Sequence, residues 1–201
     1  MASTTEIANL ALSHLGVGKE IADLDTEASQ EASSCRRFFA IARDATLRDF
    51  PWPFATKFVT LGLIEADPTD EWSYSYRYPS DCLMVRRILS GLRNDNRQSR
   101  QPFKIVQDSS GRLIYTDEVE ASIEYTVLED DPAKYPPDFT MALSLRLAAY
   151  AAPRVTGGDP FKMGQRAMQM YLDEISNARE NSAMEQQDEE VVQSEFIRSR
   201  D

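Results

Sequence analysis

The sequence has few of the residues that most often carry chemistry. Its 201 residues include one histidine, His14, and two cysteines, Cys35 and Cys82. A Ser-His-Asp triad could form only around that histidine, and no nucleophile-elbow pattern is present. Two isolated cysteines do not make a disulfide framework, and no Cys/His cluster has zinc spacing. We therefore expect free thiols in a reducing cytoplasm, with no catalytic residue, no metal site and no cofactor.

Positive charge and long apolar runs are also scarce. The chain has 22 Lys and Arg against 33 Asp and Glu, for a formal net charge of −11. This charge argues against a general affinity for DNA or for anionic membranes. The longest apolar stretch, LRLAAYAA, contains Arg146 and is too short to cross a bilayer. The opening MASTTEIANL has no early basic residue and no long apolar segment, so we expect no secretory signal.

What the sequence does contain is predicted helices at both ends, with a region between them in which apolar and polar residues alternate. Helical periodicity with capping and stop signals predicts helices over residues 3–15, 26–49, 138–152 and 160–181. From 57 to 129 the apolar period changes to two, which is typical of antiparallel strands. We predict an α+β fold, mainly an α-helical bundle with an inserted antiparallel β-sheet, in a single domain over residues 1–182. The expected inner face of the last helix consists of Phe161, Met168, Tyr171, Leu172 and Ile175.

The C-terminal segment, residues 183–201, differs from the rest of the chain. It is acidic and polar, with four isolated apolar residues, Val191, Val192, Phe196 and Ile197. One interpretation is an extended arm that becomes ordered on a partner, with these four residues as its anchors. The other is a frayed tail without a role.

Both tryptophans and many other aromatic residues lie within one short span. The stretch FPWPF places Trp52 and Phe54 where the helical period gives way to the strand period, which predicts a structural corner. The following stretch, EWSYSYRYPSDCL, contains two further candidate residues of this corner, Trp72 and Tyr76. These aromatic side chains could pack within the protein or against a subunit, stack on nucleic acid, or bind a small ligand. Arg77 is the only basic residue in that stretch, which favours packing or assembly.

Charged clusters leave further alternatives open. Basic residues gather between positions 86 and 104, at Arg86, Arg87, Arg93, Arg97, Arg100 and Lys104. They could line a solvated loop, or dock electrostatically on an acidic surface or a phosphate. The acidic stretches DPTDE and LEDDP could serve glycoside hydrolysis or bind a metal, although in loops such residues usually solvate a turn.

The order and spacing of several motifs resemble those of a known family. NLALSHLG is followed by CRRFF within a long predicted helix, by DFPWPFATKFVTL, and by WSYSYRYPSDCL. This succession resembles the phage head-to-tail adaptor proteins, also called tail tubular protein A or gateway proteins. The resemblance covers about residues 7–83 by motif, and from 130 to 180 it is of helical type only. The loop at 91–102 and the acidic arm have no counterpart in it.

The resemblance implies a structural virion protein, not an enzyme. Adaptors of this family form a twelve-subunit ring between head and tail of short-tailed phages, where they seal the DNA-filled head. The implied partners are further copies of the chain, the portal protein and the tail nozzle protein, while DNA passes through without specific binding. On this basis the C-terminal arm would dock on the portal, and Arg93, Arg97 and Arg100 would contact the nozzle or a neighbour. A related branch of head-completion proteins cleaves peptidoglycan, so a peptidoglycan hydrolase is the alternative.

Overall fold

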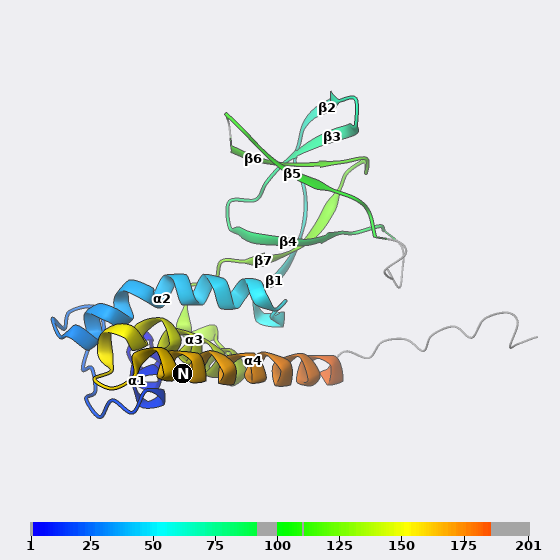
Figure 1. Ribbon diagram of the computed structural model, residues 1–201. Helices are drawn as coiled ribbons and strands as arrows, with labels where there is room; N and C mark the ends of the chain where they lie inside the picture. Colours follow the sequence, from blue (N-terminus) through cyan, green and yellow to red (C-terminus); the bar gives the residue numbers. More distant parts are fainter. Residues whose placement is uncertain (1, 92–99, 110, 186–201) are drawn as a thin grey trace, which may run out of the picture.

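The structure, a computed structural model, describes residues 2–91, 100–109 and 111–185. Four α-helices lie within these ranges: α1 (Thr4–His14), α2 (Gln30–Asp49), α3 (Pro137–Val155) and α4 (Pro160–Glu185). The strands are β1 (Thr56–Thr60), β2 (Leu63–Thr69), β3 (Trp72–Arg77), β4 (Cys82–Ile88), β5 (Lys104–Asp108), β6 (Gly111–Thr116) and β7 (Ser122–Val127). Short 3₁₀ turns, η1 (Pro53–Ala55) and η3 (Pro132–Lys134), precede β1 and α3. Figure 1 shows the helices side by side as a helical body, with the strands gathered above them as a β module.

Local hydrogen bonds determine where the first two helices begin. The Ser3 side chain accepts a hydrogen bond from the Glu6 N–H at 3.1 Å, and the Glu6 carboxylate accepts one from the Ser3 N–H at 2.8 Å. This capping box satisfies N–H groups that the first helical turn leaves free. The second helix starts later than predicted, with Ser29 as its cap. Before it, Thr26 donates to Asp23 at 2.8 Å and the chain forms a turn instead of a helix.

Helix α3 is the centre of the helical body, because it packs against α1, α2 and α4. Nine of its residues are buried, among them Phe139, Leu143 and Leu147. It continues past the predicted end at residue 152, and Pro153 lies inside its last turn. A proline near the end of a helix removes only one late hydrogen bond, so the helix need not stop there.

The strands form two antiparallel sheets, in the orders β1-β7-β4 and β2-β3-β6-β5. In the first sheet Val59 lies opposite Ile123, and in the second Tyr76 lies opposite Ile114. Ile114, Ile123 and Tyr76 are buried, so apolar side chains of both sheets contribute to one core.

The prediction of a mainly helical bundle with a single inserted sheet is therefore wrong, since the described residues contain two sheets of three and four strands. The alternation from residue 57 to residue 64 predicts one continuous strand, but the chain leaves the first sheet after β1 and enters the second at β2. The Leu61 N–H donates to Ala121 at 2.8 Å, and the Gly62 carbonyl accepts from Arg77 at 3.0 Å. A period of two shows which residues are extended, but it does not show which strand each of them pairs with.

The inner face of α4 also differs from the prediction. The side chains of Phe161 and Leu172 are 74% and 54% exposed, although both were expected inside. Tyr171 and Ile175 of the predicted face are buried as expected, and Met168 is half-buried. The buried stripe, at helical spacing, is completed by Ala167 and Ala178. Small residues in this stripe allow α4 to lie close to α3, and two large apolar side chains consequently remain on the surface.

Candidate assembly surfaces

The FPWPF stretch forms a corner at which α2, β1 and α3 meet. Trp52 is 2% exposed, and its indole N–H donates to the carbonyl oxygen of Thr46 in α2 at 2.9 Å. Its ring makes edge contacts with Phe50 and Phe139, with centroids 5.0 and 5.1 Å apart. Phe54 packs against Phe139 at 5.0 Å. These rings connect the end of α2 to the start of α3 at the point where the chain leaves for the β module.

The second aromatic stretch lies elsewhere, within the β module. Tyr76 is buried on the central strand β3, and its hydroxyl donates to the Glu118 carbonyl at 2.7 Å. Trp72, on the same strand, is half-buried. The structure thus divides the four aromatic residues of the predicted corner into two groups, with Trp52 and Phe54 at the corner and Trp72 and Tyr76 in the β module.

The basic cluster of the sequence does not gather into one patch in the part of the chain that the structure describes. Arg86 on β4 donates to the carbonyl oxygens of Leu47 and Phe50 at 3.0 Å each, and so caps the C-terminal end of α2. Arg87 pairs with Glu124 at 2.6 Å. Arg86 therefore joins the β module to the helical body, a role that its position in a basic sequence run did not indicate.

Arg93 and Arg97 lie outside the described residues, as do the arm residues Val191, Val192, Phe196 and Ile197. Arg100 is described and exposed.

A largely buried polar cluster joins three helices of the helical body. Arg146 of α3 forms an ion pair with Asp49 of α2 and donates to the hydroxyls of Tyr150 and Tyr171 at 3.0 and 2.8 Å. The Tyr171 hydroxyl of α4 also donates to Asp49 at 2.7 Å. Burial is the largest cause of the raised pKa of Tyr171, so this phenol stays protonated as a donor. Every polar group here has a partner within the protein, which is typical of a structural cluster.

One exposed apolar surface is the pair of consecutive strands β1 and β2, which we call the outer ribbon (residues 56–69). Among the described strands, β1 pairs only with β7 and β2 only with β3, so each is the edge of its sheet. Phe58 and Leu63 are 63% and 55% exposed, and Val59 and Ile64 are exposed as well. Edge strands with exposed apolar side chains are sites where another chain can attach.

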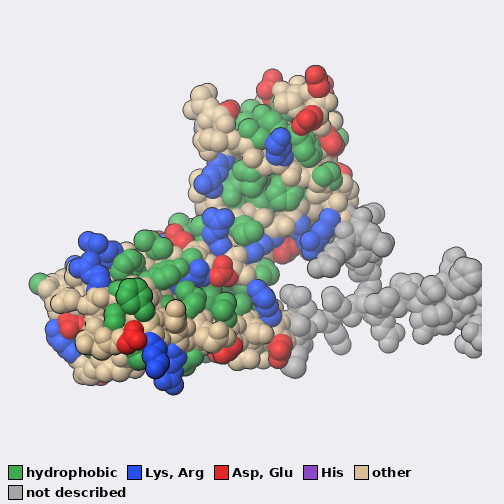
Figure 2. Space-filling view, viewed as in Figure 1, with side chains coloured by type: hydrophobic (Ala, Val, Ile, Leu, Met, Phe, Trp, Pro, Cys, Tyr) green, Lys and Arg blue, Asp and Glu red, His purple; other side chains and the backbone are tan. Residues whose placement is uncertain are grey.

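Acidic residues gather where β2 turns into β3. Glu65, Asp67, Asp70 and Glu71 are all exposed, and we call this group the acidic end. Only Glu71 approaches a cation among the described residues, since Lys104 lies 4.0 Å away. Figure 2 shows acidic side chains at the far end of the β module, and exposed hydrophobic side chains on both the β module and the helical body.

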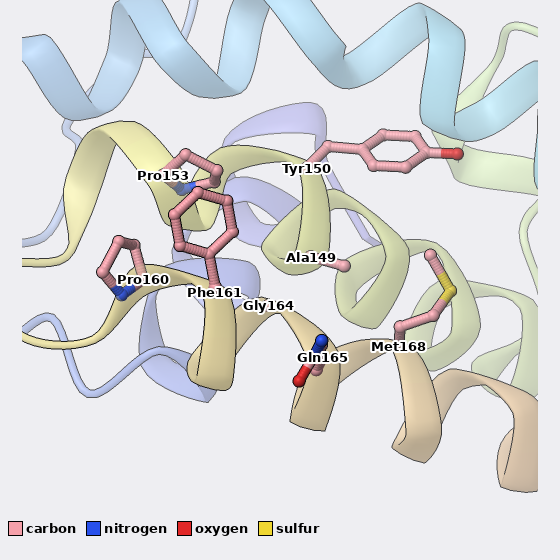
Figure 3. A pocket seen from close by; sticks show the side chains of 8 residues that line it. All are labelled: Ala149, Tyr150, Pro153, Pro160, Phe161, Gly164, Gln165 and Met168. Atoms are coloured by element: carbon pink, nitrogen blue, oxygen red, sulfur yellow. The ribbon is translucent and has the colours of Figure 1, made fainter.

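The second exposed apolar surface is a groove of about 220 Å³ between α3 and the first turns of α4. Figure 3 shows the ring of Phe161 beside Pro153, with Met168 pointing into the space between the two helices. Gly164 brings the helices close together, because a Cβ atom there would lie only 3.2 Å from the Ala149 carbonyl oxygen. The groove is lined by Ala149, Tyr150, Pro153, Pro160, Phe161, Gly164, Gln165 and Met168.

Cations flank this groove. Arg154 follows Pro153 at the end of α3, and Lys162 and Arg166 lie one turn apart on α4. All three are exposed, and none of them forms an ion pair with a carboxylate of the described residues. We call these three residues the basic rim.

The nucleophilic and titratable groups considered above do not assemble into a reactive site within the described ranges. The Nε2 atom of His14 lies 3.1 Å from the Ser144 hydroxyl, and burial lowers the pKa of the imidazole. Both cysteines are buried, and burial raises the pKa of Cys35 to about 11. No group of His, Cys, Asp or Glu in these ranges is arranged to hold a metal ion.

None of the helices in the described ranges is both long enough and apolar enough to cross a membrane. Comparison of the chain with protein-family models found no matching model, and comparison with curated proteins found no match.

Proposed function

We propose that this protein is a structural virion protein of a short-tailed phage, which forms a ring that joins the portal to the tail nozzle and seals the DNA-filled head. The observation that supports this proposal best is the presence of two different exposed apolar surfaces on one chain, the outer ribbon and the α3–α4 groove. Large exposed apolar surfaces on a protein usually mark contacts with other proteins.

Two unlike surfaces are what a ring of identical subunits requires. A two-fold dimer uses one surface that contacts itself, whereas a ring uses a head-to-tail contact between two different surfaces. The outer ribbon belongs to the β module and the groove to the helical body, so the two lie on separate parts of the molecule (Figure 1).

A ring closes only if the angle between its two contact surfaces is constant. The Trp52 corner and the bonds from Arg86 to the end of α2 join the β module to the helical body. Both connections are buried or half-buried, so they hold the outer ribbon and the groove in one relative orientation. This rigidity favours closure over open-ended association.

The acidic stretch LEDDP, which could have served hydrolysis, is used for local structure. The Asp131 carboxylate accepts from the Ala133 N–H at 3.0 Å and caps η3, while Glu129 pairs with Lys134 at 2.8 Å. Carboxylates occupied in this way solvate and stabilise a turn. Their arrangement favours the adaptor over the peptidoglycan hydrolase.

The test is negative-stain electron microscopy of the purified full-length protein, alone and mixed with the portal protein of the same phage. We expect ring-shaped density added to one end of the portal, and no clearing band in a peptidoglycan zymogram. A portal that remains bare after mixing would contradict the proposal. So would a clearing band that disappears when a single carboxylate is changed to its amide.

A further inference from the structure

We infer that the outer ribbon of one copy docks in the α3–α4 groove of a second copy, with the acidic end of the first beside the basic rim of the second. This inference rests on the proposed function and names the contact by which the ring would be built.

The two surfaces match in chemistry. The groove is lined mainly by apolar side chains, and Phe161 stands exposed at its edge. The outer ribbon offers apolar side chains on two consecutive edge strands, with Phe58 of β1 and Leu63 of β2 the most exposed. An extended strand is narrow enough to lie along the line between two helices, and it would cover Phe161 from the side that solvent now occupies.

Charge decides which surface pairs with which. The acidic end adjoins the outer ribbon, and the basic rim adjoins the groove. Contact of groove with groove would bring two basic rims together, and contact of two ribbons in the same direction would bring two acidic ends together. Both arrangements are repulsive, and two ribbons in opposite directions would lack the attraction of a basic rim, whereas ribbon in groove places Glu65 and Asp70 near Lys162 and Arg166.

The partner has to be another molecule. The outer ribbon lies in the β module and the groove lies between α3 and α4 of the helical body (Figure 1). The buried corner at Trp52 and the cap from Arg86 prevent the module from folding down onto its own groove. A second copy of the chain supplies the ribbon without any such rearrangement.

Cross-linking between two full-length variants tests this contact, because both native cysteines are buried. Leu63→Cys places a thiol on the ribbon, and Phe161→Cys places one at the groove. With a short bismaleimide, we expect a two-chain product when the two variants are mixed, and little product from either alone. A mixture of Val119→Cys with Phe161→Cys is the control, since Val119 is 66% exposed, at least as much as Leu63, but lies outside the ribbon.

The inference is overturned if the Leu63→Cys variant cross-links to itself as efficiently as in the mixture, which would mean ribbon on ribbon. Self-cross-linking of Phe161→Cys would mean groove on groove and would also overturn it. The same holds if the mixture gives no more product than the Val119→Cys control.

Charge reversal provides an independent measurement. Lys162→Glu with Arg166→Glu, added to the Phe161→Cys variant, should lower the yield of mixed product roughly tenfold at low salt. Glu65→Lys with Asp70→Lys, added to the Leu63→Cys variant, should restore it when the two are mixed. If the second pair of substitutions fails to restore the yield, the assignment of partners by charge is wrong.

The outcomes separate this inference from the proposed function. Cross-linking as expected, together with a bare portal, would leave the ribbon-to-groove contact standing and remove the adaptor function. Rings on the portal without ribbon-to-groove cross-links would keep the function and remove this contact.

Discussion

Trp52 stabilises the corner with both its apolar ring and its polar N–H group. The ring fills the space between Phe50 and Phe139, and the indole N–H satisfies the Thr46 carbonyl near the end of α2. A buried aromatic residue contributes a large apolar area at a small cost in side-chain entropy. The flanking prolines fix the backbone on both sides, so the corner depends on few residues.

We expect Trp52→Ala to lower the free energy of unfolding by about 3–5 kcal/mol, since it leaves a cavity and removes the hydrogen bond from the indole to the Thr46 carbonyl. Urea denaturation of the purified protein measures this loss. Val119→Ala is the control and should change stability by less than about 0.5 kcal/mol, because its side chain is exposed. Equal stability of the two variants would show that the corner does not depend on this ring.

His14 should make stability depend on pH. Burial lowers the pKa of its imidazole below the ordinary 6.5, so in the pH range between the two values the unfolded chain binds more protons than the folded one. Stability therefore falls as the pH falls through the unfolded pKa of 6.5. His14→Gln, which retains a polar side chain near Ser144, should flatten this dependence between about pH 7.5 and pH 5. Melting curves across that range check it, and parallel curves for variant and wild type would contradict the assignment.

At the level of elements, local signals in the sequence located most helices and strands. Ser3 and Glu6 indicated the first helix, and the alternation around Tyr125 indicated β7. The prolines at 51 and 53 indicated the corner. Such signals are local, because caps, breakers and periodicity depend on residues within a few positions of each other.

The pairing of strands and the exposed surfaces could not be read in this way. Residues 57–64 alternate without interruption, yet the chain changes sheets at Leu61 and Gly62. Phe161 and Leu172 repeat at the same spacing as core residues, but α4 is rotated so that the stripe with small residues faces α3. Which of two apolar stripes is buried depends on close contacts such as that of Gly164 with Ala149, and these form only in the folded protein.

The junction between β4 and α2 gives a prediction at this scale. Arg86→Met removes the donor to two carbonyls at the end of α2 and to the Thr126 hydroxyl, and should cost about 1–3 kcal/mol. Arg87→Met on the same strand is the matched control and should cost less, about 0–1 kcal/mol, because its ion pair with Glu124 is partly exposed. Denaturation midpoints compare the two. A larger loss for Arg87→Met would show that Arg86 does not join the two parts.

At the scale of the whole molecule, charge is distributed unevenly. The acidic end belongs to the β module, and the basic rim to the helical body. Residues 185–201 carry six acidic and two basic side chains, a formal net charge of −4 out of the total of −11. An acidic chain of this kind repels DNA, which would suit the proposed ring, through which DNA would slide.

Truncation after Met184 should leave the protein folded but weaken its binding to the portal. Among residues 2–182 whose burial is described, the last buried one is Ala178, so the removed segment follows the described core. We expect an unchanged melting temperature and a clear loss of portal binding in co-sedimentation. The matched full-length variant Val192→Ser with Phe196→Ser should behave nearly the same. Assembly of the truncated protein on the portal with unchanged yield and salt resistance would contradict the docking-arm hypothesis.

The antiparallel pairing of β1 with β7 has a consequence for the kinetics of folding. Thr56 lies opposite Thr126, so pairing of the first and last strands closes a loop that contains all the chain between them. Helix α2 precedes this segment in the sequence and α3 follows it, and their packing brings together residues as distant in sequence as Asp49 and Arg146. Contacts of such long sequence separation form slowly, because loop closure has to come first. Pairing of β1 with β7 closes almost the same loop as packing of α2 on α3, so whichever contact forms first lowers the entropy cost of the other.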